Sequence, residues 1–98
     1  MGLFGNLFGG QSQKNVKEML ANGAVIIDVR TPQEFQGGNV KGSKNIPLDR
    51  IESEAKKIKA MNKPVVVCCA SGMRSGQAKS ILQRHGIEVE NAGSWHSL

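Results

Sequence analysis

The segment VVVCCASGMRSG, residues 65–76, combines an apolar run, two adjacent cysteines and a glycine-containing loop that reaches an arginine. A short, β-branched, apolar run suits a strand that is buried on both faces, as in a parallel sheet. The residues that follow, 74–86, carry apolar side chains at helical spacing. The segment therefore predicts a strand, a tight loop and a helix in succession.

The rest of the chain repeats this alternation. Strands are expected at residues 24–29, 45–46, 63–68 and 87–90, and helices from Asn15, Thr31, Asp49 and Arg74 onward. Asn15 and Glu18 have the spacing of a capping box, and TPQE (31–34) supplies Thr31 as N-cap, a proline at N1 and Glu34 at N3 for a second helix start. Asp28 and Arg30, at the end of a buried strand, are expected to form a structural ion pair, because buried charges need partners. Strands separated by helices pair in parallel, so we predict an α/β fold, a three-layer domain with a small central parallel sheet flanked by helices.

The chain of 98 residues is long enough for one small domain. Residues 1–11 are apolar, Gly-rich and uncharged, and we expect a tail that packs on the domain or stays partly disordered rather than one that contacts a membrane. The folded domain is expected at residues 12–98. No apolar run approaches the ~20 residues that span a bilayer, and no secretory signal is recognisable, so the sequence predicts a cytoplasmic protein with reduced cysteines.

Charge and composition narrow the range of partners. Thirteen Lys and Arg residues against eight Asp and Glu give a formal net charge of +5, and aromatic residues make up only 4% of the chain. Scattered basic residues and few aromatic rings argue against a nucleic-acid partner, whereas a positive field attracts a small anionic substrate. His85 and His96 have no cluster of potential ligands around them, so no metal site and no cofactor are expected.

The loop that follows the cysteines is suited to binding an anion through backbone groups. The first N–H groups of a helix have no intrahelical partner, and the helix dipole adds positive charge. Gly72 allows the backbone to curl so that successive N–H groups point inward. These donors, with the guanidinium of Arg74, stabilise a thiolate and lower its pKa below the free value of ~8.5. The pattern therefore indicates a reactive cysteine.

Either cysteine could take that role. Five residues separate Cys68 from Arg74, the spacing of a cysteine-phosphatase phosphate loop, and four separate Cys69 from Arg74. A phosphoryl group needs the roomier loop and an acid for its leaving oxygen, which residues 70–73 do not offer, whereas one sulfur atom fits the tighter ring. Neighbouring strand residues point to opposite faces. We therefore expect Cys69 to face outward and react, and Cys68 to face the core and remain inert.

Three segments together resemble the rhodanese sulfurtransferases. CASGMRS (69–75) is similar to the family's active-site loop, in which Gly three residues and Arg five residues after the Cys are typical. DVRTPQEFQGGNVKGSKNIPL (28–48) resembles a second signature of the family, with Asn39 and Ser43 where His and Ala are usual, and NAGSW (91–95) resembles the closing segment. The resemblance covers nearly all of residues 12–98 and implies a rhodanese-like domain.

The resemblance also implies an enzyme that transfers sulfane sulfur. Cys69 would take the sulfur from a small anionic donor, such as thiosulfate or a persulfide, and pass it to cyanide, a thiol or a sulfur-acceptor protein. Arg74 would position the donor. The expected site comprises the catalytic residues Cys69 and Arg74 and the substrate-binding residues Ala70, Ser71, Gly72, Met73 and Ser75.

Two other functions remain open at this stage. One is a cysteine-dependent phosphatase that uses the Cys68-x5-Arg74 register. The dual-specificity phosphatases share the fold, but they normally have His where Val67 stands here and an acidic residue in the loop. The other is a non-catalytic rhodanese-like binding module or a dedicated sulfur carrier. The presence of Cys69 argues against an inert module, because inactive relatives usually lack the nucleophile.

Overall fold

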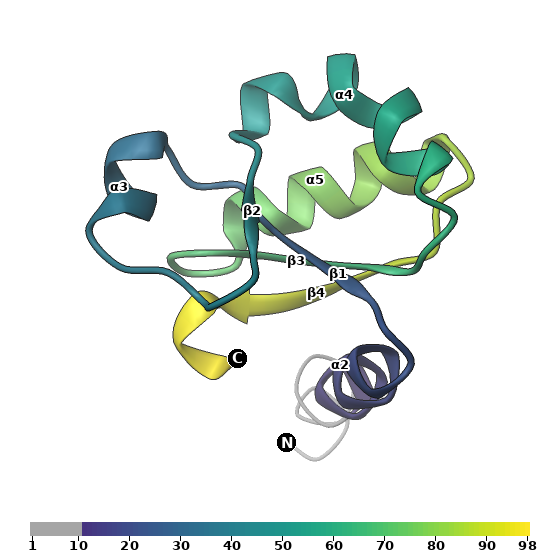
Figure 1. Ribbon diagram of the computed structural model, residues 1–98, viewed down its shortest axis with the longest axis horizontal. Helices are drawn as coiled ribbons and strands as arrows, with labels where there is room; N and C mark the ends of the chain where they lie inside the picture. The colour runs from purple at the N-terminus through teal and green to yellow at the C-terminus, as the bar shows by residue number, and fades with distance from the viewer. Residues whose placement is uncertain (1–10) are drawn as a thin grey trace.

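The computed structural model describes residues 11–98, and the predicted tail therefore lies almost wholly outside the described residues. The strands form one parallel sheet in the order β2-β1-β3-β4 (Figure 1). The strands are β1 (Val25–Asp28), β2 (Lys44–Asn45), β3 (Val65–Cys69) and β4 (Val89–Ser94). The helices are α2 (Gln11–Ala21), α3 (Pro32–Gln36), α4 (Leu48–Ala60), α5 (Met73–Arg84) and the 3-10 helix η2 (Trp95–Ser97). The predicted α/β architecture is confirmed.

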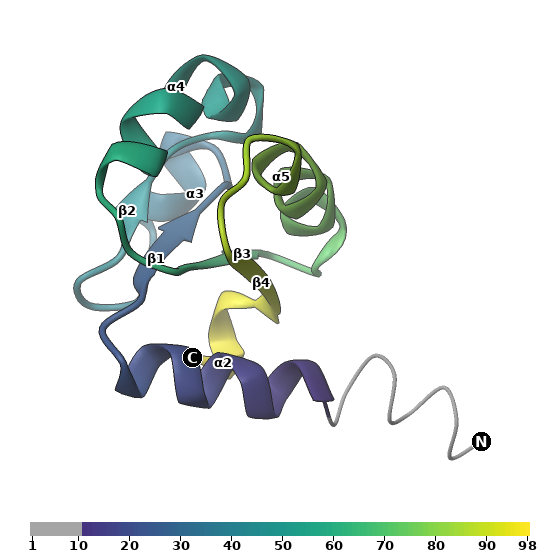
Figure 2. The same cartoon turned by 90° about the vertical axis from the view of Figure 1, so that its right-hand side faces the viewer.

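Helices cover both faces of the sheet (Figure 2). Helices α4 and α5 pack on one face, where Ile27, Val65 and Val67 of the strands meet Ile51 and Leu82 of the helices. Helix α2 and η2 lie on the other face, over a smaller apolar cluster that includes Val16, Met19 and Val66. Each fully buried aliphatic side chain contributes about 1.5–3 kcal/mol relative to an exposed one. Burial on both faces explains why β3 reads as a continuous apolar run.

The local sequence explains where α3 (Pro32–Gln36) begins and which face of α4 (Leu48–Ala60) is buried. Thr31 caps α3: its side chain accepts from the backbone N–H of Glu34, and the carboxylate of Glu34 accepts from the N–H of Thr31. This capping box is confirmed, and it fixes where Glu34 points. Helix α4 buries Ile51, Ala55 and Ile58 on its inner face, as their helical spacing predicts.

Several predicted boundaries were wrong, and three of them bear on the site. Helix α2 begins at Gln11, so Asn15 is not its cap; the Asn15 side chain instead donates to the Glu90 carboxylate. A tertiary contact has overridden the local capping signal. Strand β3 continues one residue further than expected, to Cys69, and β4 continues to Ser94, because both are paired in the sheet over that length.

An irregularity in β4 decides which way its side chains face near the loop. Val67 is paired with Asn91, but the next pair is Cys68 with Gly93, so β4 holds one extra residue at Ala92. Gly93 has a φ of 80°, which favours glycine. Bulges of this kind redirect side chains at the ends of strands. Asn91 itself pairs with Val67 before the bulge, so its side chain lies on the same face as that of Val67, the face that α5 covers.

Among residues 11–98 no helix has both the length and the apolar character needed to cross a membrane.

Candidate active site

The carboxyl end of β3, the loop 70–72 and the first turn of α5 surround the sulfur of Cys69. The sulfur accepts hydrogen bonds from the backbone N–H of Gly72 at 2.9 Å and of Ser75 at 3.4 Å. The hydroxyl oxygen of Ser75 lies 3.2 Å from the same sulfur. Gly72 has a φ of 102° and precedes α5, which is the conformation that turns its N–H back toward Cys69. The result is a compact ring of donors around one sulfur atom.

The two cysteines have opposite pKa shifts. Burial opposes ionisation of Cys69, but the Ser75 hydroxyl and the N–H groups of Ser75, Gly72 and Ser71 outweigh it, and the pKa of Cys69 is lowered. Burial and the nearby carboxylate of Asp28 raise the pKa of Cys68 to about 12. At neutral pH, therefore, Cys68 is a thiol, and the loop favours the thiolate of Cys69.

The expectation that Cys69 faces outward was wrong. Both cysteines are 0% exposed, and Cys69 packs with Val65 and Val67 on the α5 side of β3. The cause is the extra strand residue: Cys69 still belongs to β3, so its side chain follows the alternation of the strand and points under α5. The expected opposite orientation of the two cysteines holds, and Cys68 is paired with Asp28 in the neighbouring strand β1.

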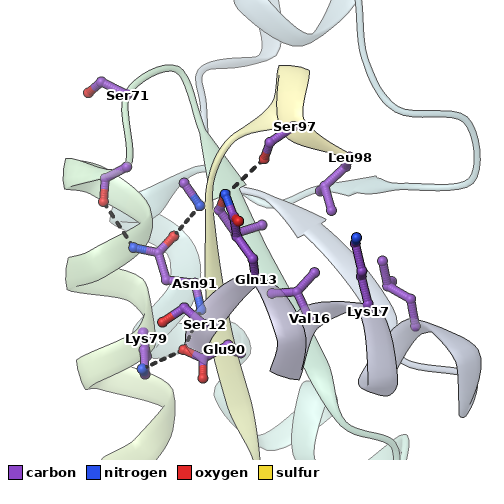
Figure 3. Close-up of a pocket in the computed structure, with 14 residues that line it drawn as sticks. Ser12, Gln13, Val16, Lys17, Ser71, Lys79, Glu90, Asn91, Ser97 and Leu98 are labelled. Atoms are coloured by element: carbon purple, nitrogen blue, oxygen red, sulfur yellow. Dashed lines mark hydrogen bonds and ion pairs between the residues drawn. The ribbon is translucent and has the colours of Figure 1, made fainter. Parts of the chain in front are cut away.

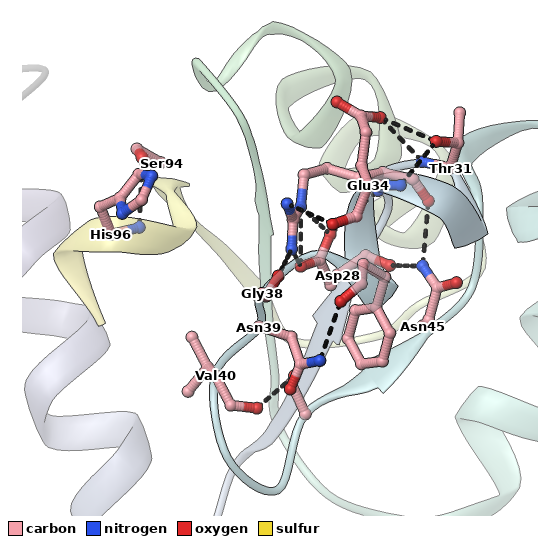
Figure 4. Close-up of polar contacts among 12 residues, drawn as sticks. Asp28, Thr31, Glu34, Gly38, Asn39, Val40, Asn45, Ser94 and His96 are labelled. Atoms are coloured by element: carbon pink, nitrogen blue, oxygen red, sulfur yellow. Dashed lines mark hydrogen bonds and ion pairs between the residues drawn. The ribbon is translucent and has the colours of Figure 1, made fainter.

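Arg74 is not a free cation in the loop. It is the second residue of α5, and its guanidinium binds the carboxylate of Glu34 through two hydrogen bonds of 2.7 and 3.0 Å. These bonds and those from Thr31 lower the pKa of Glu34 to about 2. Figure 4 shows Glu34 beside Thr31, at the start of α3. Helix α3 thus holds the guanidinium of Arg74 through the carboxylate of Glu34.

The predicted ion pair between Asp28 and Arg30 is present and buried. Arg30 Nη2 lies 2.7 Å from the Asp28 carboxylate, and both side chains are at most 5% exposed. Arg30 also donates to the carbonyl of Gly38 and stacks on Trp95, with 4.5 Å between its Cζ and the ring centroid. These contacts join the end of β1 to the loop after α3 and to η2, and so they fix the frame around the site.

The remaining predicted residues differ in exposure. Ala70 and Ser71 are exposed at the tip of the loop, and Met73 is 77% exposed, so these three side chains face solvent beside the ring.

Asn39 and Ser43, which replace the usual His and Ala, make local bonds: Asn39 donates to the carbonyl of Phe35, and Ser43 donates to that of Val40 (Figure 4).

Two residues of the site were missed by the sequence analysis. Glu34 was interpreted only as part of a capping box. Asn91 was quoted only within NAGSW, yet its amide contacts Ser75, Gly72 and Gly93 at once. The sole signal in the sequence was that Glu34 and Asn91 lie in segments that resemble the rhodanese signatures.

A groove of about 770 Å³ adjoins the loop on the side of α2 (Figure 3). Ser71 and Gly72 form one end, and Val16 and Leu98 contribute apolar walls. Asn91 lies between the loop and this groove. Within the described part of the chain, no three His, Cys, Asp or Glu side chains gather closely enough to hold a metal ion.

The fold and the site define an α/β domain with a cysteine-centred anion loop after its third strand. The sequence model of the rhodanese-like domain matches residues 12–96, and the chain belongs to that family.

The relatives agree with this assignment. PspE of Escherichia coli K12, a thiosulfate sulfurtransferase, is 45% identical over 69 residues, which cover 68% of this chain and 66% of PspE. YqhL of Bacillus subtilis is 41% identical over 69 residues, or 69% of this chain and 54% of YqhL. The chain thus spans between about half and two thirds of the length of these two relatives.

Solved structures resemble the chain over most of its length. A rhodanese with anions from E. coli has a TM-score of 0.69 and 40% identity, and covers 76% of this chain and 91% of its own. The human single-domain sulfurtransferase TSTD1 has a TM-score of 0.67 and 29% identity, with coverage of 86% and 88%.

Proposed function

We propose that the protein is a sulfurtransferase that carries sulfane sulfur as a persulfide on Cys69. The observation that supports this best is the ring of donors around the Cys69 sulfur, from the N–H groups of Gly72 and Ser75 and the hydroxyl of Ser75. The ring stabilises a negative charge on sulfur, whether that charge belongs to the thiolate or to a sulfur atom added to it. Membership of a family with members named thiosulfate sulfurtransferase supports the same reaction.

The chemistry has two steps. The Cys69 thiolate attacks the outer sulfur of thiosulfate; a bond forms between the two sulfur atoms, the bond from the outer sulfur to the sulfite group breaks, and sulfite leaves with the electron pair. An acceptor thiolate or cyanide then attacks the outer sulfur, and Cys69 leaves as thiolate. Splitting the transfer in this way replaces one difficult encounter by two easier displacements.

Arg74 has a supporting role in this proposal. The Glu34 carboxylate neutralises much of its charge, so Arg74 presents a positioned guanidinium edge to an incoming anion rather than an isolated positive charge. A donor with negative oxygens meets this edge while its sulfur approaches Cys69. The net charge of +5 adds a weak attraction over longer distance.

The phosphatase register receives no support from the geometry. It requires Cys68 as nucleophile, and Cys68 is buried against Asp28 with a pKa of about 12. The thiolate, not the thiol, is the nucleophile, and a pKa of about 12 leaves almost no thiolate at neutral pH. The donors of the loop meet at Cys69, on the other face of β3.

The test is intact mass spectrometry after incubation with thiosulfate or with a low-molecular-weight persulfide. We expect the wild type and Cys68→Ser to gain the mass of one sulfur atom, and Cys69→Ser to gain none. Failure of the wild type to gain sulfur from either donor overturns the proposal, and so does a gain that survives in Cys69→Ser but not in Cys68→Ser. The loaded protein is then mixed with cyanide or a thiol: loss of the added mass with repeated turnover is expected, whereas retention identifies a dedicated carrier instead.

A further inference from the structure

The side-chain amide of Asn91 has only one orientation that fits its neighbours. The backbone N–H of Gly93 lies 2.8 Å from one end of the amide and can only donate, so that end is the oxygen. The carbonyl of Gly72 lies 3.1 Å from the other end and can only accept, so that end is the nitrogen. The assignment of oxygen and nitrogen therefore follows from backbone groups whose roles are fixed.

This orientation determines what Ser75 can do. The hydroxyl of Ser75 lies 2.7 Å from Asn91 Oδ1 and 3.2 Å from the Cys69 sulfur. A carbonyl-type oxygen only accepts, so the Ser75 proton points to Asn91 whenever that bond is made. The hydroxyl carries one proton, and it cannot donate to Asn91 and to Cys69 at the same time.

The two charge states of Cys69 need different positions of that proton. A Cys69 thiol can donate to the Ser75 oxygen while Ser75 donates to Asn91, and every group is then satisfied. A negatively charged sulfur has no proton to give and calls for the Ser75 proton itself. Asn91 Oδ1 retains the N–H of Gly93 when Ser75 turns away, so the rotation leaves no buried oxygen without a donor.

We propose that Asn91 is a positioning residue that holds the Ser75 hydroxyl away from Cys69 in the thiol state and releases it to the sulfur when the sulfur becomes anionic. The proposal rests on Cys69 being the sulfur-carrying residue. Asn91 touches neither donor nor acceptor in this scheme; it acts through Ser75 and, by its bond to the Gly72 carbonyl, through the loop.

Other titratable groups influence Cys69 and set the controls. Arg74 on α5 interacts electrostatically with Cys69, and Glu34 on α3 pairs with Arg74. Cys68 on β3 also interacts with Cys69, but its own titration, near pH 12, is well separated. None of the substitutions proposed below touches these groups, so their contributions are common to all four proteins of the comparison.

The test is a double-mutant cycle read by the ultraviolet absorbance of the thiolate as pH is raised. The four proteins are the wild type, Ser75→Ala, Asn91→Ala and the double variant. Loss of Asn91 has two opposing effects on the pKa of Cys69. It loosens Gly72, which raises this pKa whether residue 75 is Ser or Ala. It also frees the Ser75 proton for the sulfur, which lowers this pKa only in the protein that has Ser75. We therefore expect Asn91→Ala to raise the pKa more in the Ser75→Ala background. The expected difference is about half to one pKa unit, or roughly three- to tenfold in the thiolate-to-thiol ratio.

The proposal is tested by the sign of the difference between the pKa changes that Asn91→Ala causes with and without Ser75. If Asn91 merely aimed Ser75 at the sulfur, its loss would raise the pKa more when Ser75 is present, and that result, or no difference at all, overturns the proposal. If Asn91→Ala does not fold, Asn91→Asp provides a second double-mutant cycle with Ser75→Ala. A carboxylate at position 91 keeps the Ser75 proton more strongly, so Asn91→Asp should raise the pKa of Cys69 more when Ser75 is present than when it is absent. The titration needs no sulfur donor, so it remains interpretable even if persulfide loading fails.

Discussion

Gly72→Ala is the substitution that tests the loop most directly. Gly72 has a φ of 102°, a backbone conformation that L residues rarely adopt, and its N–H donates to the Cys69 sulfur at 2.9 Å. An alanine Cβ at this position would lie 3.3 Å from the Cα of Gly93. Because that neighbour is backbone, the strain has to be relieved by moving the loop away from β4, and the N–H moves with it.

The expected effects are of two kinds. Placing an L residue in the left-handed region costs about 1–2 kcal/mol of folding stability, and each kcal/mol lowers Tm by about 4–8 °C in a domain of this size. A hydrogen bond to a charged acceptor is worth about 1.5–3 kcal/mol, which at 1.36 kcal/mol per unit corresponds to a rise of about one to two units in the pKa of Cys69. At a fixed pH below that pKa, persulfide loading should slow about ten- to hundredfold.

Gly23→Ala is the matched control. Gly23 also has a positive φ, of 87°, and a Cβ there would meet no atom within 4 Å. It follows α2, at the other end of the sheet from the loop (Figure 1). Thermal denaturation should reveal a similar loss of stability in both variants, whereas the thiolate titration and the rate of loading by thiosulfate should change only in Gly72→Ala.

The comparison can refute the reasoning in two ways. If Gly72→Ala is destabilised like Gly23→Ala but keeps the wild-type pKa and loading rate, the Gly72 N–H does not stabilise the sulfur. If both variants lose loading to the same degree, general destabilisation rather than the loop geometry is responsible.

Three further outcomes are expected. Cys68→Ser should load sulfur with the wild-type pH profile, and a profile displaced by more than half a pH unit would contradict an inert Cys68. The pKa of Glu34 is lowered from its usual 4.5 to about 2, so its stabilising contribution is complete above about pH 4.5 and is lost as pH falls through about 2. Urea denaturation should therefore show that wild type is more stable than Glu34→Gln above pH 4.5 and that this difference closes as pH falls to about 2. A difference that persists unchanged at pH 2 would exclude the Arg74 pair as its cause. Arg30→Ala leaves the fully buried Asp28 carboxylate without its ionic partner, so unfolding by urea should require about 3–5 kcal/mol less than in wild type. A loss below 1 kcal/mol would contradict the buried ion pair as a source of stability.

Local patterns predicted the elements that form the frame of the site. The apolar run before the cysteines is a strand buried on both faces, and TPQE begins a helix with the expected reciprocal cap. The pair of Asp28 and Arg30 could also be predicted, because the two residues are two positions apart where β1 ends and neither charge is stable there alone. Each of these features depends on residues that are close in the sequence.

The parts that escaped prediction depend on residues far apart in the sequence. Glu34 and Arg74 are separated by 40 positions, and Ser75 and Asn91 by 16. Asn91 reaches Ser75 because β4 pairs with β3 beyond the predicted end at residue 90, which sets Asn91 beside Val67 on the face that α5 covers, and the bulge at Ala92 follows it. No periodicity encodes a bulge, and a single sequence does not specify where two strands stop pairing. The same reason explains the error about Cys69: one more residue of pairing turned an expected outward side chain into a buried one.

Cys68 and Cys69 form an internal comparison that isolates the cause of their opposite pKa shifts. They are consecutive residues of one strand, both 0% exposed, so desolvation alone would raise the pKa of each. The pKa of Cys68 does rise, to about 12, beside the carboxylate of Asp28, while that of Cys69 falls because Ser75, Gly72 and Ser71 donate to its sulfur. Burial is common to both and therefore cannot explain the difference. The loop explains it, since it delivers its donors to one face of β3 only. In the proposed reaction, the face on which β3 presents a cysteine decides whether it can act as the nucleophile, and a shift of one residue in the register of β3 would exchange the two positions.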